Sequence, residues 1–202
     1  MTMRLLGRAD SSNVQRVVWA LGELGLPHER EDRGGPFGGL DDPAYRALNP
    51  AGVVPTLVDG GLAVWESTAI LRHLARREGR LWPRAAAGLA RADTAMDWTQ
   101  ASFWPAVRVP FQAVVKRGVP RGDDGVRRGA TEAARATLPV LDALVRDGSA
   151  SGEGFALCDI PAAVVLHRLL DLAPGTALPD GVAAWWAAVS ARPAFKAAVW
   201  VR

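Results

Sequence analysis

The residues best suited to do chemistry are concentrated between Asn49 and Leu74, in the stretch NPAGVVPTLVDGGLAVWESTAILRHL. Pro55 stands in a run of strand-forming residues, although a proline removes a donor from a strand ladder. This conflict indicates that the backbone at Val54-Pro55 is left open to hydrogen-bond with something else. We therefore predict that the Val54-Pro55 bond is cis. This geometry is rare among ordered X-Pro bonds and, where it occurs, is a retained structural feature.

Two further polar groups lie at predicted helix starts. Ser11, Ser12 and Asn13 precede a helix with a regularly spaced apolar face (Val14, Val17, Val18, Leu21 and Leu24), and Glu66-Ser67 opens a later helix. Serine and asparagine at such positions can act as simple helix caps, and a glutamate there complements the helix dipole. The same groups can also bind an anion, because a helix N-terminus presents unpaired N–H donors.

Other kinds of chemistry find little support. The single cysteine, Cys158, excludes an internal disulfide, CxxC redox chemistry and a cysteine-rich zinc site. The three histidines (His28, His73 and His167) do not have the spacing of metal ligands. We therefore expect no metal.

The elements that position these residues fall into two parts. The pattern predicts a β-α-β-α-β-β-α order to about Gly79, a linker over residues 80–85 containing Trp82-Pro83, and helices over 86–202. We expect the helical segment 86–117 to break near Pro105 and Pro110, and a short tail after Arg192. The fold class is thus a small α/β domain (1–79) followed by an all-helical domain (86–202).

Composition limits the partners. The net charge is +3 and the arginines are scattered rather than massed, which argues against nucleic-acid binding. No apolar run approaches the length of a membrane span, and the first ten residues lack the apolar core of a signal peptide. We expect a soluble cytoplasmic protein without a membrane partner.

The whole chain resembles the glutathione S-transferases, and its first part resembles their thioredoxin-like domain. The more specific match is NPAGVVPTLVDGGLAVWESTAILRHLA, with Pro55 and Glu66-Ser67 at the family's spacing. SSNVQRVVWALGELGLP resembles the first catalytic loop and helix of the serine-type bacterial members, and FALCDIP and ARPAF are weaker matches. The resemblance implies a homodimeric, glutathione-dependent detoxification enzyme.

The resemblance assigns a role to each site residue. Val54, before cis-Pro55, would exchange backbone hydrogen bonds with the cysteinyl part of glutathione, as an added strand does. Ser67 would bind the γ-glutamyl carboxylate, and Glu66 would pair with the ammonium group. Ser11, Ser12 or Asn13 would stabilise the thiolate, and the sequence leaves open which of the three does so.

The electrophile pocket is also implied by the resemblance alone. Its expected lining lies in the first helices of the second domain, and the candidates are Trp98, Phe103, Trp104 and Phe111. Aromatic residues at near-helical spacing are more often core than pocket wall, so some of the four are expected to be buried.

The sequence departs from the family pattern at two positions that bear on function. Val53 stands where many relatives carry a basic residue for the glycyl carboxylate, and Arg33 or Arg46 could substitute for it. Ala156 stands where the family's capping box has a serine or threonine, so we expect the helix to start late, with Asp159 as its N-cap. These departures support an alternative function, a non-catalytic module of the same fold that dimerises or binds proteins.

Overall fold

The computed structural model describes residues 2–200, and they divide into two compact units. The first comprises residues 2–81 together with 193–200, and the second comprises residues 82–192. The sequence assigned all of 86–202 to one helical domain, whereas the backbone contacts group 193–200 with the first unit. No helix in the described part of the chain is long and apolar enough to cross a bilayer.

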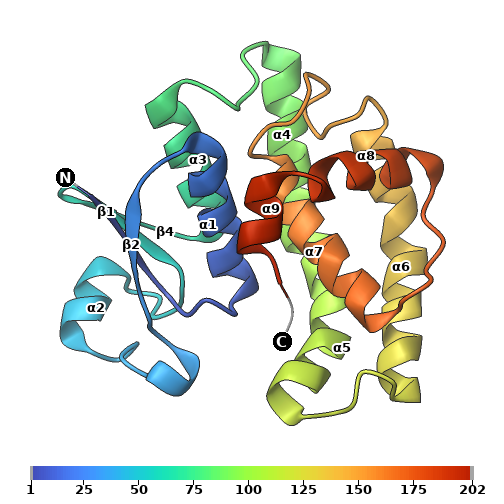
Figure 1. The fold of residues 1–202 in the computed structure, drawn as a ribbon, viewed down its shortest axis with the longest axis horizontal. Coiled ribbons are helices and arrows are strands. Elements are labelled where there is room, and N and C mark those ends of the chain that lie inside the picture. Colours follow the sequence, from blue (N-terminus) through green and yellow to red (C-terminus); the bar gives the residue numbers. More distant parts are fainter. Residues whose placement is uncertain (1, 201–202) are drawn as a thin grey trace. The chain divides into compact units, whose positions relative to one another are not determined.

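The first unit is built on a four-stranded mixed sheet in the order β2-β1-β3-β4 (Figure 1). The strands are β1 (Met3–Leu6), β2 (His28–Glu31), β3 (Thr56–Asp59) and β4 (Leu62–Trp65). β1 pairs with β2 in parallel and with β3 antiparallel, so Leu5 lies opposite Leu57, and both side chains are fully buried. β3 and β4 form an antiparallel hairpin that turns at Gly60.

Three helices of this unit follow the predicted order. They are α1 (Ser12–Leu24), α2 (Pro43–Leu48) and α3 (Ser67–Glu78), and a 3₁₀ turn at Gly35–Phe37 precedes α2. α1 ends at Gly25, which takes the left-handed conformation typical of a helix C-cap. Asp42 caps α2 by accepting a hydrogen bond from the Ala44 N–H, as the Asp-Pro sequence predicts.

The last helix of the chain, α9 (Pro193–Ala198), forms where we expected a tail. It packs against α1, as Figure 1 shows for the red helix beside the blue one. The edge of the Trp19 ring meets the Phe195 ring at 5.1 Å between centroids. Gly22 permits this approach, because a Cβ there would lie only 3.2 Å from the Ala194 Cβ. Tertiary packing thus stabilises a helix too short to form alone.

The second unit is entirely helical. Its helices are α4 (Ala86–Trp98), α5 (Trp104–Arg117), α6 (Asp124–Val145), α7 (Asp159–Leu172) and α8 (Asp180–Ser190). α7 is apolar on nearly all sides and buried, as expected of a helix at the centre of a bundle. The predicted fold class, an α/β thioredoxin-like part and an all-helical part, is confirmed.

The 86–117 segment is not broken near Pro105, contrary to the prediction. A π-helical turn at Thr99–Phe103 joins α4 to α5, and Phe103 and Trp104 keep right-handed helical dihedrals, so Pro105 produces a local irregularity rather than a break. The prediction of a break at Pro110 was wrong, because Pro110 stays inside α5.

The start of α7 shows how the chain compensates for Ala156. The helix begins late, at Asp159 as predicted, but Cys158 and not Asp159 occupies the N-cap. The buried Asp159 carboxylate instead accepts three hydrogen bonds, from the N–H groups of Ala150 (2.8 Å) and Ala156 (2.9 Å) and from Trp185 Nε1 (2.8 Å). Burial raises the pKa of Asp159 above its usual value, and the three hydrogen bonds oppose that rise.

Candidate functional site

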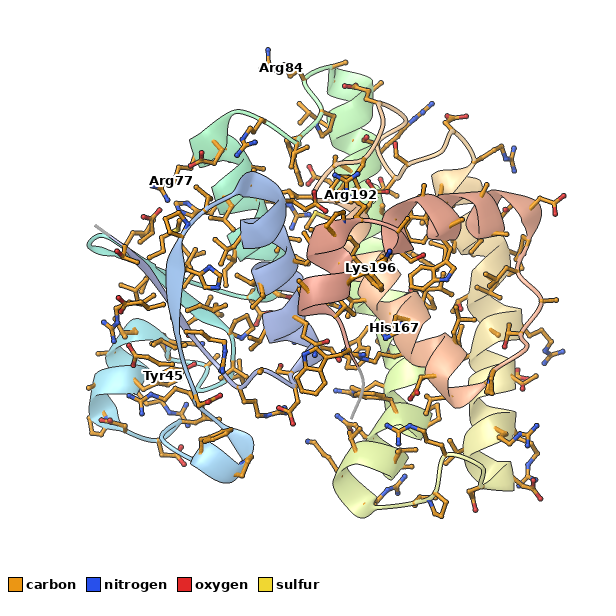
Figure 2. The ribbon with its side chains drawn as sticks, in the orientation of Figure 1. Tyr45, Arg77, Arg84, His167, Arg192 and Lys196 are labelled. Carbon is orange, nitrogen blue, oxygen red and sulfur yellow. The ribbon has the colours of Figure 1, made fainter. Side chains whose placement is uncertain are left out.

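A buried network of hydrogen bonds fixes the segment before β3. Val53 C=O accepts hydrogen bonds from the Tyr45 hydroxyl (2.6 Å) and from Asn49 Nδ2 (2.7 Å). Both donors also contact Thr56 Oγ1 at 3.0 Å, and Tyr45 is labelled in Figure 2. Asn49 and Thr56 are fully buried, so this segment is fixed from beneath by a satisfied network.

The Val54-Pro55 peptide bond is cis, as predicted. Val54 lies two residues before β3 begins, and across residues 2–200 neither its N–H nor its C=O forms a hydrogen bond. One donor and one acceptor are therefore presented together beyond the end of a strand. This arrangement suits the addition of a short extended peptide.

The approach of β1 to Val54 depends on Gly7. A Cβ at Gly7 would lie 2.6 Å from Val14 Cγ2 and 3.1 Å from Val54 Cβ. Because Gly7 has no side chain, both Val54 and the first turn of α1 can pack closely against its backbone. This role was not predicted from the sequence, although a glycine that ends a predicted strand is a signal of close backbone approach.

The three polar residues at the start of α1 have different surroundings. Ser11 is the N-cap, only 8% exposed, and its hydroxyl forms no hydrogen bond within the described part of the chain. Ser12 is the first helical residue and is also buried. Asn13 Oδ1 accepts a weak hydrogen bond from Ser67 Oγ at 3.5 Å. Of the three, Ser11 has an uncommitted hydroxyl at the helix N-terminus.

The hydrogen bond between Asn13 and Ser67 joins the N-termini of two helices. Ser67 is the first residue of α3, is 1% exposed, and its Oγ also accepts a hydrogen bond from Arg16 Nη1 at 3.3 Å. Arg16 is fully buried, so its positive charge lies beneath both helix starts. Two helix N-termini and a buried guanidinium together favour an anion at this place.

Glu66 adds an exposed carboxylate beside this positive region. It occupies the N-cap of α3 with φ 67° and ψ 118°, a backbone conformation that non-glycine residues rarely adopt. Its carboxylate has no partner among residues 2–200. A strained non-glycine residue with an unpaired charge is typical of a ligand site. An acceptor for a cationic group therefore stands next to the donors of α3.

The structure brings some of the seven site residues predicted in the first unit into contact with one another. The structure joins Asn13 to Ser67 directly, Glu66 is the neighbour of Ser67, and Ser11 and Ser12 are the neighbours of Asn13. Val54 and cis-Pro55 are brought to α1 through Gly7. Sequence reasoning missed Arg16, whose only signal was a charged residue on a helix dense in apolar residues.

Two arginines were considered as replacements for a basic side chain at position 53. Val53 is 46% exposed. Arg46 donates to Pro50 C=O at 2.9 Å and pairs with Asp41 at 2.7 Å, and it lies against Gly52. The Arg33 guanidinium lies 3.9 Å from the Glu31 carboxylate, a long ion pair. Arg46 is therefore committed to its own loop, and Arg33 is less so.

Of the four aromatic candidates in the second unit, one is a core residue and three are partly exposed. Phe103 is fully buried and stacks on Trp98 at 5.3 Å between ring centroids. Trp104 contacts Phe111 at 5.8 Å, and the Arg168 guanidinium lies 5.6 Å from the Phe111 ring centre. Trp98, Trp104 and Phe111 are half-buried, whereas Phe103 is a core residue, as the sequence analysis expected for some of the four.

Comparison with known proteins identifies the family. The family model described as glutathione S-transferase, N-terminal domain, matches residues 10–77. Glutathione S-transferase GstB of Escherichia coli strain K12 is 32% identical over 202 residues, covering 98% of this chain and 97% of the relative. The chain belongs to the glutathione S-transferase superfamily.

Further members support the assignment over the whole length. Glutathione S-transferase 3 of Zea mays is 34% identical, covering 98% of this chain and 93% of the relative. The crystal structure of a theta class glutathione S-transferase from Xanthomonas axonopodis pv. citri, with glutathione bound, is 36% identical. It aligns with a TM-score of 0.86 and covers 100% of this chain and 98% of that one. The transferase fold is thus matched in both units.

Proposed function

We propose that this chain is a glutathione transferase that activates the thiol of glutathione at the N-terminus of α1, for attack on a small hydrophobic electrophile. The observation that carries the proposal is the free donor and acceptor of Val54 beside two linked helix N-termini. Glutathione is an extended peptide with an ammonium group and two carboxylates, and it meets each of these features with a complementary group.

The proposed binding mode places each part of glutathione on one element. The cysteinyl backbone pairs with Val54 N–H and C=O, as in strand addition. The γ-glutamyl carboxylate accepts hydrogen bonds from Ser67 and the N-terminus of α3, and the ammonium group pairs with Glu66. The similar Xanthomonas structure holds glutathione, which supports glutathione as the ligand of this fold.

We assign activation of the thiol to Ser11. Its hydroxyl is uncommitted, whereas Asn13 Oδ1 already accepts from Ser67, so Asn13 acts as a positioning residue. Lowering a thiol pKa from about 8.5 by two units takes about 2.7 kcal/mol. A hydrogen bond to a charged group supplies about 1.5–3 kcal/mol, and a helix N-terminus adds about 0.3–1 kcal/mol. One hydroxyl at this helix end is therefore sufficient.

We propose that the electrophile contacts Trp98, Trp104 and Phe111 and that the enzyme works as a cytoplasmic homodimer in detoxification. The alternative of a non-catalytic module is not favoured. The capping-box departure that supported it is compensated by the three hydrogen bonds of Asp159, and the Ser11 hydroxyl remains available for chemistry.

Single substitutions at the start of α1 test the proposal. With an aryl halide and saturating glutathione at pH 7, Ser11→Ala should lower the conjugation rate about 25-fold, the ratio of thiolate fractions for pKa values of about 6.5 and 8.5. Ser12→Ala should change the rate little, and Asn13→Ala should have an intermediate effect. Unchanged rates in all three variants would defeat the mechanism, and the absence of glutathione binding in calorimetry would defeat the function.

A further inference from the structure

A buried glutamine joins the start of α1 to the end of the described chain. Gln15 is the fourth residue of α1 and is 1% exposed. Its Nε2 donates to Ala9 C=O at 3.1 Å and to Trp200 C=O at 3.2 Å, although Trp200 lies 185 positions further along the chain. Both acceptors are carbonyl oxygens, so the NH2 end of the amide faces them, and its two hydrogens serve one carbonyl each.

The hydrogen bond to Ala9 holds the loop that carries Ser11. Ala9 lies two residues before Ser11, and the Gln15 backbone N–H donates to Ser11 C=O at 2.9 Å. Gln15 therefore fixes this loop at two points, through its side chain and through its main chain. The Ser11 hydroxyl forms no hydrogen bond of its own among residues 2–200, so its position follows from that of the loop.

The hydrogen bond to Trp200 holds the segment that follows α9. This segment continues from Val199, which is 5% exposed and whose N–H donates to Phe195 C=O at 2.8 Å. Phe195 in turn packs on Trp19 of α1. The chain after α9 therefore runs back to the N-terminal end of α1, as Figure 1 shows, and Gln15 holds it there. One side chain thus connects the packing of α9 to the loop before α1.

We propose that Gln15 is a positioning residue for activation of the glutathione thiol. It fixes the Ser11 hydroxyl at the helix N-terminus, and the segment after α9 supports it through Trp200 C=O. The inference rests on the proposed function, because it concerns the same hydroxyl. Without the amide, the two carbonyls would have to turn towards water, since leaving a buried acceptor unsatisfied is unfavourable. The loop would then shift, and the hydrogen bond from Ser11 to the thiolate would weaken as its distance and angle depart from the optimum.

Gln15→Met tests this role, because it keeps the length of the side chain and removes both donors. The thiol pKa in the complex, expected at about 6.5 in the unaltered protein, should rise by about one pH unit. With saturating glutathione and an aryl halide, the conjugation rate should therefore fall about threefold at pH 7, the ratio of the two thiolate fractions, and should be unchanged at pH 9. The calorimetric affinity for glutathione should be unchanged at about pH 5.5, where the thiol is largely protonated in both proteins.

Two further variants separate this role from a loss of packing. Gln112→Met makes the same change in α5 of the helical unit and should leave the thiol pKa unaltered. Gly22→Leu acts on the support from α9 without altering Gln15, because even a Cβ at Gly22 would lie 3.2 Å from Ala194 Cβ. It should raise the thiol pKa less than Gln15→Met does. The variant carrying both substitutions should not exceed Gln15→Met, because the two act on one connection.

The same measurements distinguish failure of this inference from failure of the proposed function. A thiol pKa in Gln15→Met equal to that of the unaltered protein would overturn the inference and leave the proposed function standing, and so would a rate loss that is equal at neutral and at alkaline pH. If Gln15→Met does not fold, Gly22→Leu decides, and an unaltered thiol pKa in that variant would overturn the inference. An unshifted thiol pKa in the unaltered protein would overturn both.

Discussion

Substitution of Ser67 by alanine probes the link between the two helix N-termini. It removes the hydroxyl that accepts from Arg16 at 3.3 Å and donates to Asn13 at 3.5 Å. Hydrogen bonds to charged groups contribute about 1.5–3 kcal/mol, and the long distances here place the loss of unfolding free energy near 1.5 kcal/mol. The same hydroxyl is a proposed donor to the γ-glutamyl carboxylate, so glutathione should bind about 10- to 100-fold more weakly.

The assay combines urea unfolding with calorimetric titration of glutathione. Ser190→Ala is the matched control, because Ser190 ends α8 in the helical unit and the same atoms are removed there. It should change neither quantity. For Ser67→Ala, the Michaelis constant for glutathione should rise more than the turnover number falls. An unchanged affinity for glutathione in Ser67→Ala would refute the assignment of this residue to the γ-glutamyl end.

Three further substitutions test other parts of the account. Gly7→Ala should lower the unfolding free energy by about 1–3 kcal/mol, because the new Cβ would lie 2.6 Å from Val14 Cγ2 and 3.1 Å from Val54 Cβ. It should also weaken glutathione binding by displacing Val54, and unaltered binding would argue against a positioning role. Glu66→Gly should weaken glutathione binding about two- to fivefold, because an exposed ion pair is lost. Its stability in thermal unfolding should be equal or higher, because glycine adopts φ 67° without strain, and a clear loss of stability would contradict the strain argument. Asp159→Asn should cost about 2–4 kcal/mol in urea unfolding, because the NH2 end of the amide would face at least one of the three N–H donors and the negative charge that they share would be lost. A loss below about 0.5 kcal/mol would show that these bonds matter little.

The order of elements in the sheet unit was predictable because its signals are local. Pro55 within a valine-rich strand, Gly25 after an apolar helix and Asp42 before Pro43 each restrict the backbone by their own chemistry. The cis bond at Pro55 was predicted on the same basis. The short helix α9 was not, because six residues carry too little periodicity and the helix depends on packing against α1.

The choice among the residues at the start of α1 required coordinates. Successive helical residues point in directions about 100° apart, so the sequence alone cannot say which one faces a ligand. The structure separates Ser11, with a free hydroxyl, from Asn13, which is tied to Ser67. The burial of Arg16 was equally hidden, since an arginine among apolar residues usually lies on the solvent side of a helix.

The most direct test of the account is the pKa of the glutathione thiol in the complex, followed by the ultraviolet absorbance of the thiolate as pH is varied. In the unaltered protein the thiol should titrate about two pH units below its ordinary value of about 8.5, and in Ser11→Ala it should return close to that value. Equal pKa values in the two proteins would contradict the assignment of thiol activation to Ser11, as would an unshifted pKa in the unaltered protein.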